Sequence, residues 1–448
     1  MGRRIRKATV GLGLALCLVA AALSSATGAY ASGATGAHEA HTSAASALPG
    51  GVNVLGIGDF TQAAQVNQAV AQAQALHAKL IRTVVAWSAL EPSGPQQVDP
   101  STLTVMDRLL SDATAAGIRV IVSVDSTPCW ASSAPSALLA ACDPGRESAA
   151  NSWPPNEPAA YGAFVAYLAK RYSTGLAALE VWNEPDQANE DYLAGPSKPE
   201  RYAGLLRAAY PAIKAVDPSL PVLAGSLVGS NGTFLRALYA AGIKGYYDGL
   251  AVHFYNLTLG SLRSIHEVQL ANGDSTPLWL DEFGWSSCWP AQPIEQEQAC
   301  VTPKLQASNL ASTYRELVHT PWVAAAVVYK LQDSPSEDFG LTTASGARKP
   351  SFAAFAAALA SPFAKVTPIV LQLRRKGAHV LASGSAPVGD FMGLEAFKGK
   401  LLRYRAIFKL DRFNRYSLVL PSALGTHGLR VRVFQYWSGP SKAAQKRI

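Results

Sequence analysis

The sequence predicts an α/β protein with two parts, a (β/α)8 barrel of the TIM type followed by a small all-β sandwich. Between residues 51 and 361, short apolar runs alternate with longer segments of helical period, which is the pattern of repeated βα units. Eight such pairs occur in this stretch, as a closed barrel of eight parallel strands requires. After residue 361, only short alternating stretches remain, separated by Gly, Pro and Ser. We therefore expect a barrel at 51–361 and a β-sandwich at 362–448.

The eight expected strands are short and apolar: Val52–Ile57, Leu80–Ala86, Ile118–Val124, Ala177–Trp182, Pro221–Ala224, Gly249–His253, Leu278–Asp281 and Val323–Tyr329. A helix is expected after each of them: Gln62–His77, Ser101–Ala116, Ala159–Arg171, Pro199–Val216, Gly232–Ala241, Leu259–Ala271, Pro303–His319 and Ser351–Leu359. An open, doubly wound sheet is the main alternative for such a series. It is disfavoured because no Gly-x-Gly-x-x-Gly or phosphate-binding loop follows any expected strand.

The end of the fourth expected strand carries an unusual pair of polar residues. An apolar run at 176–179 leads into Glu180-Val181-Trp182-Asn183-Glu184-Pro185, so Asn183 and Glu184 arrive where a buried strand should end. Pro185 cannot donate to a sheet ladder and favours an extended conformation at Glu184. Strand packing requires no carboxylate there, whereas an amide beside a carboxylate is suited to holding a hydroxylated substrate.

Polar and aromatic residues also follow other expected strands, and in a barrel the carboxyl ends of all strands meet at one rim. These residues are Arg82, Trp87 and Glu91 at strand two, Asp125, Thr127 and Trp130 at strand three, His253 and Tyr255 at strand six, and Asp281, Glu282 and Trp285 at strand seven. Arg82 lies within an apolar run, where an unpaired charge is costly to bury. It therefore predicts a carboxylate across the barrel, and Glu282 is the natural candidate.

Together these motifs resemble the retaining glycoside hydrolases of clan A, which are barrels with catalytic glutamates on strands four and seven. The resemblance rests on Asn183-Glu184-Pro185 and on Leu280-Asp281-Glu282-Phe283-Gly284-Trp285. Within the clan, the sequence is most similar to family 39 and its bacterial relatives, through Val181-Trp182-Asn183-Glu184-Pro185, the Arg82…Trp87…Glu91-Pro92 pattern and Thr127-Pro128-Cys129-Trp130-Ala131. This resemblance covers the expected barrel and does not extend to the tail.

The resemblance implies that Glu184 is the acid/base, that Glu282 is the nucleophile and that Asn183 binds the 2-hydroxyl of the sugar. Arg82 and Tyr255 would keep Glu282 ionised, while a nearby negative charge and Trp182 should raise the pKa of Glu184 toward the working pH. At strand eight the chain departs from the clan, because Val328-Tyr329-Lys330-Leu331 stands where a Trp usually supports the −1 sugar. The expected substrate-binding residues are Asn183, Arg82, His253, Tyr255, Trp130, Trp285 and Tyr329.

The expected function is hydrolysis of an oligo- or polysaccharide by two glutamates without a cofactor, and alternatives remain open for several parts of it. Asp281 competes with Glu282 as nucleophile, and His253 could be a hydrogen-bonded structural residue. The tryptophans could stack on sugars or plug the top of the core. A catalytically lapsed barrel that only binds carbohydrate is the second function class. A metal-dependent hydrolase is the third, and it is disfavoured because only His253 of eight histidines lies at a strand end.

The N-terminus predicts secretion. Arg3, Arg4, Arg6 and Lys7 precede an apolar run at 8–23, and Ala29-Tyr30-Ala31 offers small residues for cleavage, as in a signal peptide at 1–31. Residues 32–50 are rich in Ala, Ser, Gly and Thr and are expected to form a flexible leader. The apolar run is too short to span a bilayer comfortably, so no stable membrane insertion is expected.

Four cysteines remain beyond the expected signal peptide, an even number that fits an oxidising compartment. Three pairings are possible, and we favour the short-range one, Cys129–Cys142 with Cys288–Cys300. Each bond would close a loop of a dozen or so residues and contribute up to about 3 kcal/mol. A zinc site is disfavoured because no pair has Cys-x-x-Cys spacing.

The net charge of +8 is unevenly distributed along the chain. From Ser361 onward there are 16 Lys and Arg against three acidic residues, so this tail is strongly basic. These cations could simply solvate the outer strand faces, or they could bind an acidic polysaccharide or cell-envelope polymer. We expect a monomer, with carbohydrate as the substrate and no nucleic acid as a partner.

Overall fold

The computed structural model describes residues 48–255, 260–288, 300–365, 368–387, 391–411, 413–436 and 443–448. The expected signal peptide at 1–31 and all but the last three residues of the expected leader lie outside this range. Within it, no helix combines the length and the apolar character needed to cross a lipid bilayer.

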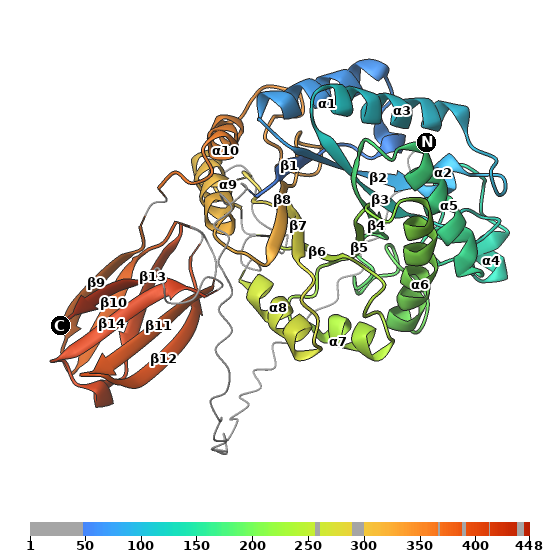
Figure 1. The fold of residues 1–448 in the computed structure, drawn as a ribbon. Helices are drawn as coiled ribbons and strands as arrows, with labels where there is room; N and C mark the ends of the chain where they lie inside the picture. Colours follow the sequence, from blue (N-terminus) through green and yellow to red (C-terminus); the bar gives the residue numbers. More distant parts are fainter. Residues whose placement is uncertain are drawn as a thin grey trace, which may run out of the picture. The chain divides into compact units, whose positions relative to one another are not determined.

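The first eight strands close into one parallel barrel, with β8 paired back to β1 (Figure 1). They are β1 (Gly50–Asn53), β2 (Leu80–Ala86), β3 (Arg119–Asp125), β4 (Leu176–Val181), β5 (Val222–Leu227), β6 (Gly249–His253), β7 (Leu278–Phe283) and β8 (Val323–Val328). All eight expected strands therefore form. The largest differences in their bounds are at β1, which ends four residues early before the short 3-10 turn η1 (Ile57–Asp59), and at β5, which continues to Leu227.

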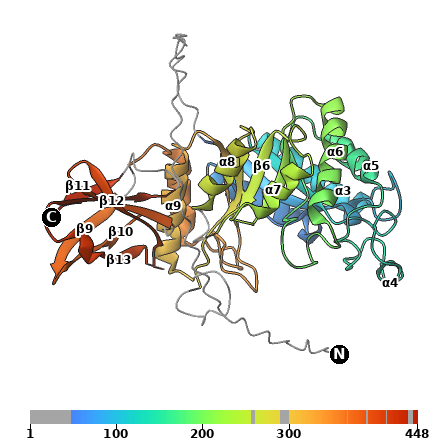
Figure 2. The ribbon, with the colours of Figure 1, turned by 90° about the horizontal axis from the view of Figure 1, so that it is seen from below.

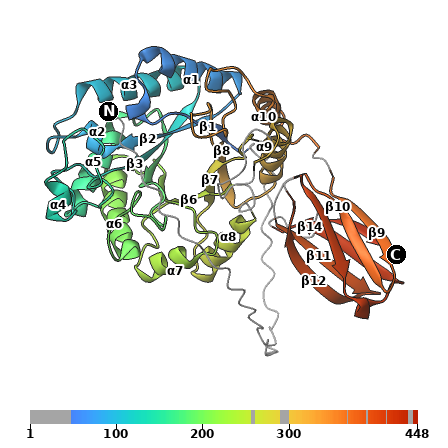
Figure 3. The ribbon, with the colours of Figure 1, turned by 180° about the vertical axis from the view of Figure 1, so that it is seen from behind.

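The expected helices all form as well, and they surround the barrel in Figures 1 and 3. They are α1 (Ala63–Ala75), α3 (Pro100–Ala115), α5 (Pro158–Arg171), α6 (Lys198–Val216), α7 (Thr233–Ala240), α8 (Ser261–Ala271), α9 (Pro303–Leu317) and α10 (Pro350–Ala360). Two further short helices, α2 (Trp87–Leu90) and α4 (Ser136–Leu139), lie in the βα loops. Proline occupies the first turn of α3, α5, α6, α9 and α10, where its missing N–H costs no helical hydrogen bond.

The barrel interior is apolar at the amino ends of the strands and polar at their carboxyl ends. A cluster of buried apolar side chains fills the amino end: Leu80, Ile121, Ala177, Ala178, Leu223, Ala251, Ala325 and Val327. On β2 and β4, the inward positions two residues further along are Arg82 and Glu180, and both are fully buried. The charged layer therefore lies directly above a dry core, at the end of the barrel where active sites occur.

The tail forms two antiparallel sheets, which appear as separate layers in Figure 2. One sheet has the order β13 (Arg415–Leu420), β10 (His379–Ser385), β9 (Val370–Lys376), and the other has the order β12 (Leu401–Lys409), β11 (Phe391–Lys398), β14 (Leu429–Gln435), β15 (Ala444–Arg447). Their facing sides share one core that includes Leu371, Val380, Met392, Leu394 and Val431. The predicted β-sandwich is confirmed, although the sequence pattern did not reveal β10, β11 or β15.

Both short-range disulfides form, one between Cys129 and Cys142 and one between Cys288 and Cys300. The first ties the loop after β3, and the second joins the loop after β7 to the segment before α9. Both loops leave the carboxyl end of the barrel, so the crosslinks restrain the rim on which the polar residues gather.

Candidate active site

An irregular backbone carries Glu184 into the barrel mouth. After β4 ends, Trp182 and Glu184 adopt left-handed φ values of 68° and 46°, which are uncommon for residues other than glycine. The extended conformation expected at Glu184 before Pro185 is therefore wrong. The Trp182 N–H donates to the Val124 carbonyl, and the Asp186 carboxylate accepts from the backbone N–H groups of Val228 and Gly229. The loop is thus fastened on both sides of Glu184, as strained backbone at a functional site requires. This explains the role of Asp186, which caps a loop and does not face the cavity.

A bulge in β7 turns two consecutive acidic residues inward. Against β6, the register passes from Val252–Leu280 to His253–Glu282, which leaves Asp281 as the extra residue. In a regular strand, Asp281 and Glu282 would point to opposite faces. Because of the bulge, both carboxylates reach the Arg82 guanidinium, at 3.0 Å from Asp281 and 2.7 Å from Glu282.

Arg82 is the centre of the charged layer and is fully buried. The carboxylate predicted as its partner, Glu282, accepts from Nη1 at 2.7 Å. A second partner of Arg82 was not predicted. The Glu180 carboxylate accepts hydrogen bonds from Arg82 Nε and Nη2 at 2.9 and 2.8 Å, which makes a bidentate pair. Nη2 also donates to Asn183 Oδ1 at 2.9 Å, which fixes the orientation of that amide. One arginine therefore holds the polar groups of β4 and β7 in register.

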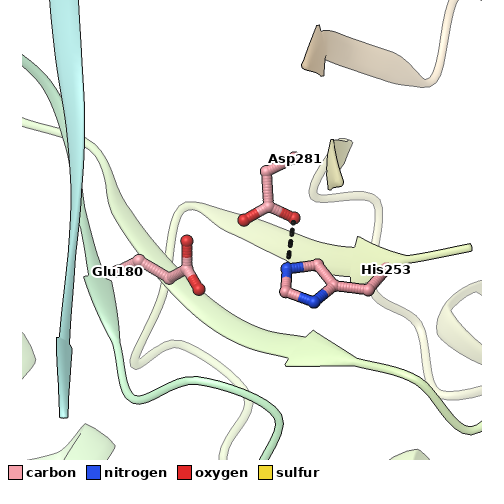
Figure 4. Close-up of side chains that lie close together, drawn as sticks. All are labelled: Glu180, His253 and Asp281. Carbon is pink, nitrogen blue, oxygen red and sulfur yellow. Dashed lines mark ion pairs between the residues drawn. The ribbon is translucent and has the colours of Figure 1, made fainter. Parts of the chain in front are cut away.

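Below the rim, Glu180, Asp281 and His253 lie close together around the barrel axis (Figure 4). His253 Nε2 faces Asp281 Oδ1 at 3.7 Å, and neither atom has a hydrogen-bond partner among the described residues. Burial raises the pKa of Glu180 to about 8, whereas Arg82 and His253 outweigh the effect of burial on Asp281 and lower its pKa to about 2. Asp281 is thus a supporting charge beneath His253, not a group that faces the cavity.

At the rim, His253 bridges the two glutamates. Its Nδ1 lies 2.7 Å from Glu184 Oε1 and 3.4 Å from Glu282 Oε2. The nitrogen and one oxygen of each glutamate all lie within 4.8 Å of one another. Glu184 also accepts from Gln187 Nε2 at 2.8 Å, and the Tyr255 hydroxyl donates to Glu282 Oε2. The glutamates of strands four and seven therefore face each other across one small space.

The pKa pattern of this pair differs from the expectation. Burial alone would raise the pKa of Glu184, but the hydrogen bond and charge of His253 outweigh burial and lower it. Burial raises the pKa of Glu282, and His253 and Arg82 offset only part of that rise. His253 itself has a pKa well above its usual value, because the carboxylates of Glu282 and Asp281 outweigh its burial. The expected order was wrong because the sequence does not show that an imidazolium contacts Glu184 directly.

A cavity of about 750 Å³ opens above the pair. Most of the predicted site residues line it: Arg82, Asn183, Glu184, His253, Tyr255, Glu282 and Tyr329. Its lining also includes residues that were not predicted, namely Asn53, Gln187, Tyr192, Lys330, Glu337 and Phe339. Tyr255, Tyr329 and Phe339 pack edge to face, with ring centroids 5.5 to 5.7 Å apart. The Tyr329 hydroxyl donates to Glu337 at 2.9 Å. Tyrosine and phenylalanine rings thus form the aromatic wall near strand eight.

Two predicted substrate residues lie elsewhere. Trp130 packs edge to face on the buried Trp87, and its indole N–H donates to the Glu91 carbonyl at 2.9 Å. Trp285 is 2% exposed within the barrel core. Neither lines the cavity, so the described geometry gives both tryptophans a packing role. The sequence left both roles open for these tryptophans, because a strand end can face either the cavity or the surrounding helices, and spacing alone does not distinguish the two.

Two groups of potential metal ligands occur among the described residues, namely Glu180 with His253 and Asp281, and Glu184 with His253 and Glu282. Arg82 already lies against Glu180, Asp281 and Glu282. A divalent cation placed among these carboxylates would be repelled by the guanidinium at short range in a region of low dielectric. The donor set therefore suits an arginine-centred ion network better than a metal centre.

Glu180 is the principal site residue that the sequence interpretation missed. The argument applied to Arg82, that a charge in an apolar run needs a buried partner, applies equally to Glu180 within β4. Asn53 was also missed, although its side chain bonds Arg82, the Asp281 carbonyl and the Val328 carbonyl. No sequence pattern marks Asn53, because it lies at the end of β1 as one polar residue among many.

Removing Arg82 should destabilise the barrel strongly. In an Arg82→Met variant, three buried carboxylates lose their shared cation, and we expect the free energy of unfolding to fall by about 3 to 5 kcal/mol or more. Urea denaturation followed by tryptophan fluorescence measures this loss.

The matched control is Arg171→Met, which removes an arginine paired with Asp107 at 2.6 Å where both side chains are more than a third exposed. That loss should be about 1 kcal/mol or less. Equal losses in the two variants would show that the buried network does not stabilise the fold.

The comparisons with known proteins agree with the barrel fold. Residues 42–301 match the family model described as cellulase (glycosyl hydrolase family 5). No curated protein matches the chain. Solved structures share its fold. A family 39 glycoside hydrolase from the gut symbiont Bacteroides cellulosilyticus WH2 is 19% identical, with 84% of this chain and 81% of that chain covered and a TM-score of 0.54.

Two further structures belong to the same group. The GH39 enzyme from Xanthomonas axonopodis pv. citri is 15% identical over 83% of this chain and 90% of its own, with a TM-score of 0.52. A GH39 β-xylosidase from Caulobacter crescentus is 18% identical over 79% and 83%, with a TM-score of 0.52. The expected likeness to clan A is thereby confirmed. The sequence match is to family 5, and these family 39 structures share the fold.

Proposed function

Because the chain belongs to the cellulase family, glycosyl hydrolase family 5, we propose that it hydrolyses glycosidic bonds of an oligo- or polysaccharide with retention of configuration. The observation that carries this proposal is the approach of Glu184 and Glu282 to within 4.8 Å around His253. Retaining enzymes place their carboxyl groups about 5 to 5.5 Å apart, whereas inverting enzymes leave about 6.5 to 9.5 Å for a water molecule. The spacing here supports direct attack by one carboxylate.

In the first step, Glu282 attacks the anomeric carbon while Glu184 gives a proton to the leaving oxygen. The bond to the leaving group breaks, and an ester forms between the sugar and Glu282. Arg82 and Tyr255 hold the two oxygens of Glu282 and so aim the carboxylate. The proton for Glu184 comes across the 2.7 Å contact from His253 Nδ1, which carries it in the resting site.

In the second step, Glu184, now a carboxylate, removes a proton from water as the water oxygen attacks the anomeric carbon. The ester breaks, Glu282 leaves as a carboxylate, and the proton on Glu184 returns to His253. Asn183 is held by Arg82 through its Oδ1, so its Nδ2 is the end free to face the 2-hydroxyl of the sugar. Both steps therefore use groups that the charged layer has already oriented.

Labelling with activated 2-deoxy-2-fluoro glycosides tests this proposal, because fluorine slows loss of the glycosyl-enzyme more than its formation. The panel begins with glucosides and cellobiosides, after the family name, and adds xylosides, after the β-xylosidase of similar fold. Intact mass should rise by one sugar, and the labelled peptide should contain Glu282. A panel that neither labels the protein nor releases a chromophore would favour the carbohydrate-binding alternative, and a label on Asp281 would reverse the assignment of the nucleophile.

Replacing His253 should shift the pH profile. In a His253→Asn variant, Glu184 loses the imidazolium that lowers its pKa, and Glu282 loses an offsetting positive charge. Both carboxyl pKa values should rise, so both limbs of the kcat/KM profile should move to higher pH. Initial rates on a chromogenic glycoside across the pH range measure this shift.

His266→Asn is the control for that experiment, since His266 lies on α8 and stacks on Trp322 outside the cavity. Its profile should coincide with that of the wild type. Limbs that stay in place in His253→Asn, or move to lower pH, would contradict the proposed role of His253.

We also propose that the protein acts outside the cell as a monomer and that its tail contacts an acidic polysaccharide or cell-envelope polymer. The signal-type N-terminal sequence and the two disulfides support secretion. The excess of thirteen positive charges after Ser361 supports the polymer. Mass analysis of the secreted product would show whether cleavage follows Ala31.

A further inference from the structure

Five cations gather on one face of the sheet β12-β11-β14-β15. They are Arg405 and Lys409 on β12, Arg430 and Arg432 on β14, and Arg447 on β15, and we call this surface the cationic face. The strand register places them together, because residues directly opposite each other in an antiparallel pair share a face. Arg405 and Arg432 both lie opposite Glu395, Arg430 lies opposite Phe397 and Arg447, and Lys409 lies opposite Phe391.

The other side of this sheet is the sandwich core, where Met392, Leu394, Val431 and Val433 are buried. Along β14 the alternation is therefore apolar inward and basic outward at Arg430 and Arg432, whereas β11 places Phe391, Gly393, Glu395 and Phe397 on the outward side between the flanking cations. A solvated outer face normally mixes both signs of charge. Among the described residues on the cationic face, Glu395 is the single acid, and both of its oxygens are taken by Arg405 and Arg432.

The arginines near β14 are ordered by the sheet itself. The guanidinium carbons of Arg430 and Arg432 lie 4.1 and 5.1 Å from the centre of the Phe397 ring. Arg430 also donates to Gln445 at 3.0 Å. Arg432 already pairs with Glu395, whereas Arg430 has no carboxylate partner among the described residues. Because the sheet orders the Arg430 guanidinium beforehand, less conformational entropy is lost when it binds a carboxylate.

Arg430 and Arg447 are an unfavourable pair in the free protein. They are direct cross-strand partners of like charge, and no ion pair to either is found among the described residues. Like charges directly opposite each other destabilise a sheet. An anion bound between the two arginines would relieve this repulsion. If the two side chains were only solvated, the repulsion would remain.

We propose that the cationic face binds a linear acidic polysaccharide whose sugars carry carboxylates. Neighbouring strands place cations about 4.8 Å apart and alternate residues along a strand place them about 6.8 Å apart, so a polymer with regularly repeated carboxylates meets several at once. The Phe397 ring is not accessible for stacking with a nucleic-acid base, because it is 8% exposed and covered by arginine. This assignment rests on the proposed polymer contact of the tail and does not depend on hydrolysis by the barrel.

The test uses the full-length protein and biolayer interferometry on immobilised polygalacturonate, with dextran and anionic lipid vesicles as comparison surfaces. The wild type should bind polygalacturonate and not dextran, and binding should weaken as salt rises from about 20 to about 200 mM. Arg430→Gln with Arg447→Gln should weaken binding about tenfold. The matched control, Lys170→Gln with Lys304→Gln, removes two exposed charges from α5 and α9 and should weaken it less than about twofold.

Each outcome discriminates. If the wild type does not bind polygalacturonate, or binds only the vesicles, the acidic polysaccharide is wrong as the partner. If the two double variants weaken polygalacturonate binding equally, the tail acts through net charge and the assignment of the binding site to the cationic face is wrong. A Glu282→Gln variant should bind as the wild type does, so failure of the hydrolytic function would leave this result unchanged. Circular dichroism and activity on a chromogenic glycoside should match the wild type in both double variants.

Discussion

Replacing Glu282 with alanine should lower kcat on the order of 10⁴-fold or more, the scale expected when the nucleophile of a two-step reaction is removed. Neither of the two neighbouring carboxyl groups can take its place. Asp281 is fully buried and lies against Arg82, and Glu184 is needed as the acid. Steady-state rates on a chromogenic glycoside measure the loss, and added azide should yield at most a glycosyl azide of inverted configuration.

Glu337→Gln is the matched control, because Glu337 is another acidic residue that lines the same cavity and contacts Tyr329 and Lys330. We expect kcat to stay within about tenfold of the wild type, since no step of the mechanism uses this carboxyl. Comparable losses in the two variants would show that the cavity needs its negative charge in general, and Glu282 would lose its special role.

Replacing Glu184 with alanine should lower kcat/KM by about 10² to 10⁴-fold on substrates with poor leaving groups, because these need protonation in the transition state. The loss should be small when the leaving group is already a good one. Azide is small enough to enter the space left by the side chain and should restore turnover in the second step. The product should be a glycosyl azide of retained configuration, and its stereochemistry by NMR distinguishes Glu184 from Glu282.

Gln187→Ala serves as the comparison variant, since it removes the hydrogen bond to Glu184 Oε2 but leaves the carboxyl in place. It should keep most of its activity and should not respond to azide. If azide also accelerated this variant, rescue would reflect a general effect on the cavity, and the acid/base assignment would lose its support.

The barrel could be read from the sequence because its pattern is local. Each strand from β1 to β8 is a short apolar run, and each following helix has its own period. Several of these helices also carry a first-turn signal, as the Pro residues of α3 and α9 show. In the tail the pattern failed at β11, because both of its faces are covered. On one side, Glu395 and Phe397 are buried under arginine side chains and Gly393 lies under the Phe434 ring, so no clear alternation appears.

Glu184 and Glu282 could be proposed from sequence for a similar reason. A carboxylate that ends an apolar run has no role in packing, and parallel strands bring such residues to one rim. The sequence also predicted the pairing of Arg82 with Glu282, because a buried cation requires a partner. Trp130 and Trp285 do not line the described cavity, and the sequence had left open whether these rings stack on sugars or plug the core.

By itself the sequence determined the strands and main helices of the barrel, their order, and the two glutamates that reach its rim, since these follow from periodicity and from the cost of burying charge. Only the tertiary structure decided the state of the site. The bulge at Asp281 turns two adjacent acids inward, and the contact of His253 with Glu184 reverses the expected order of the two carboxyl pKa values. Both depend on distances between strands far apart in the chain, and electrostatic energies change steeply with such distances in a buried layer.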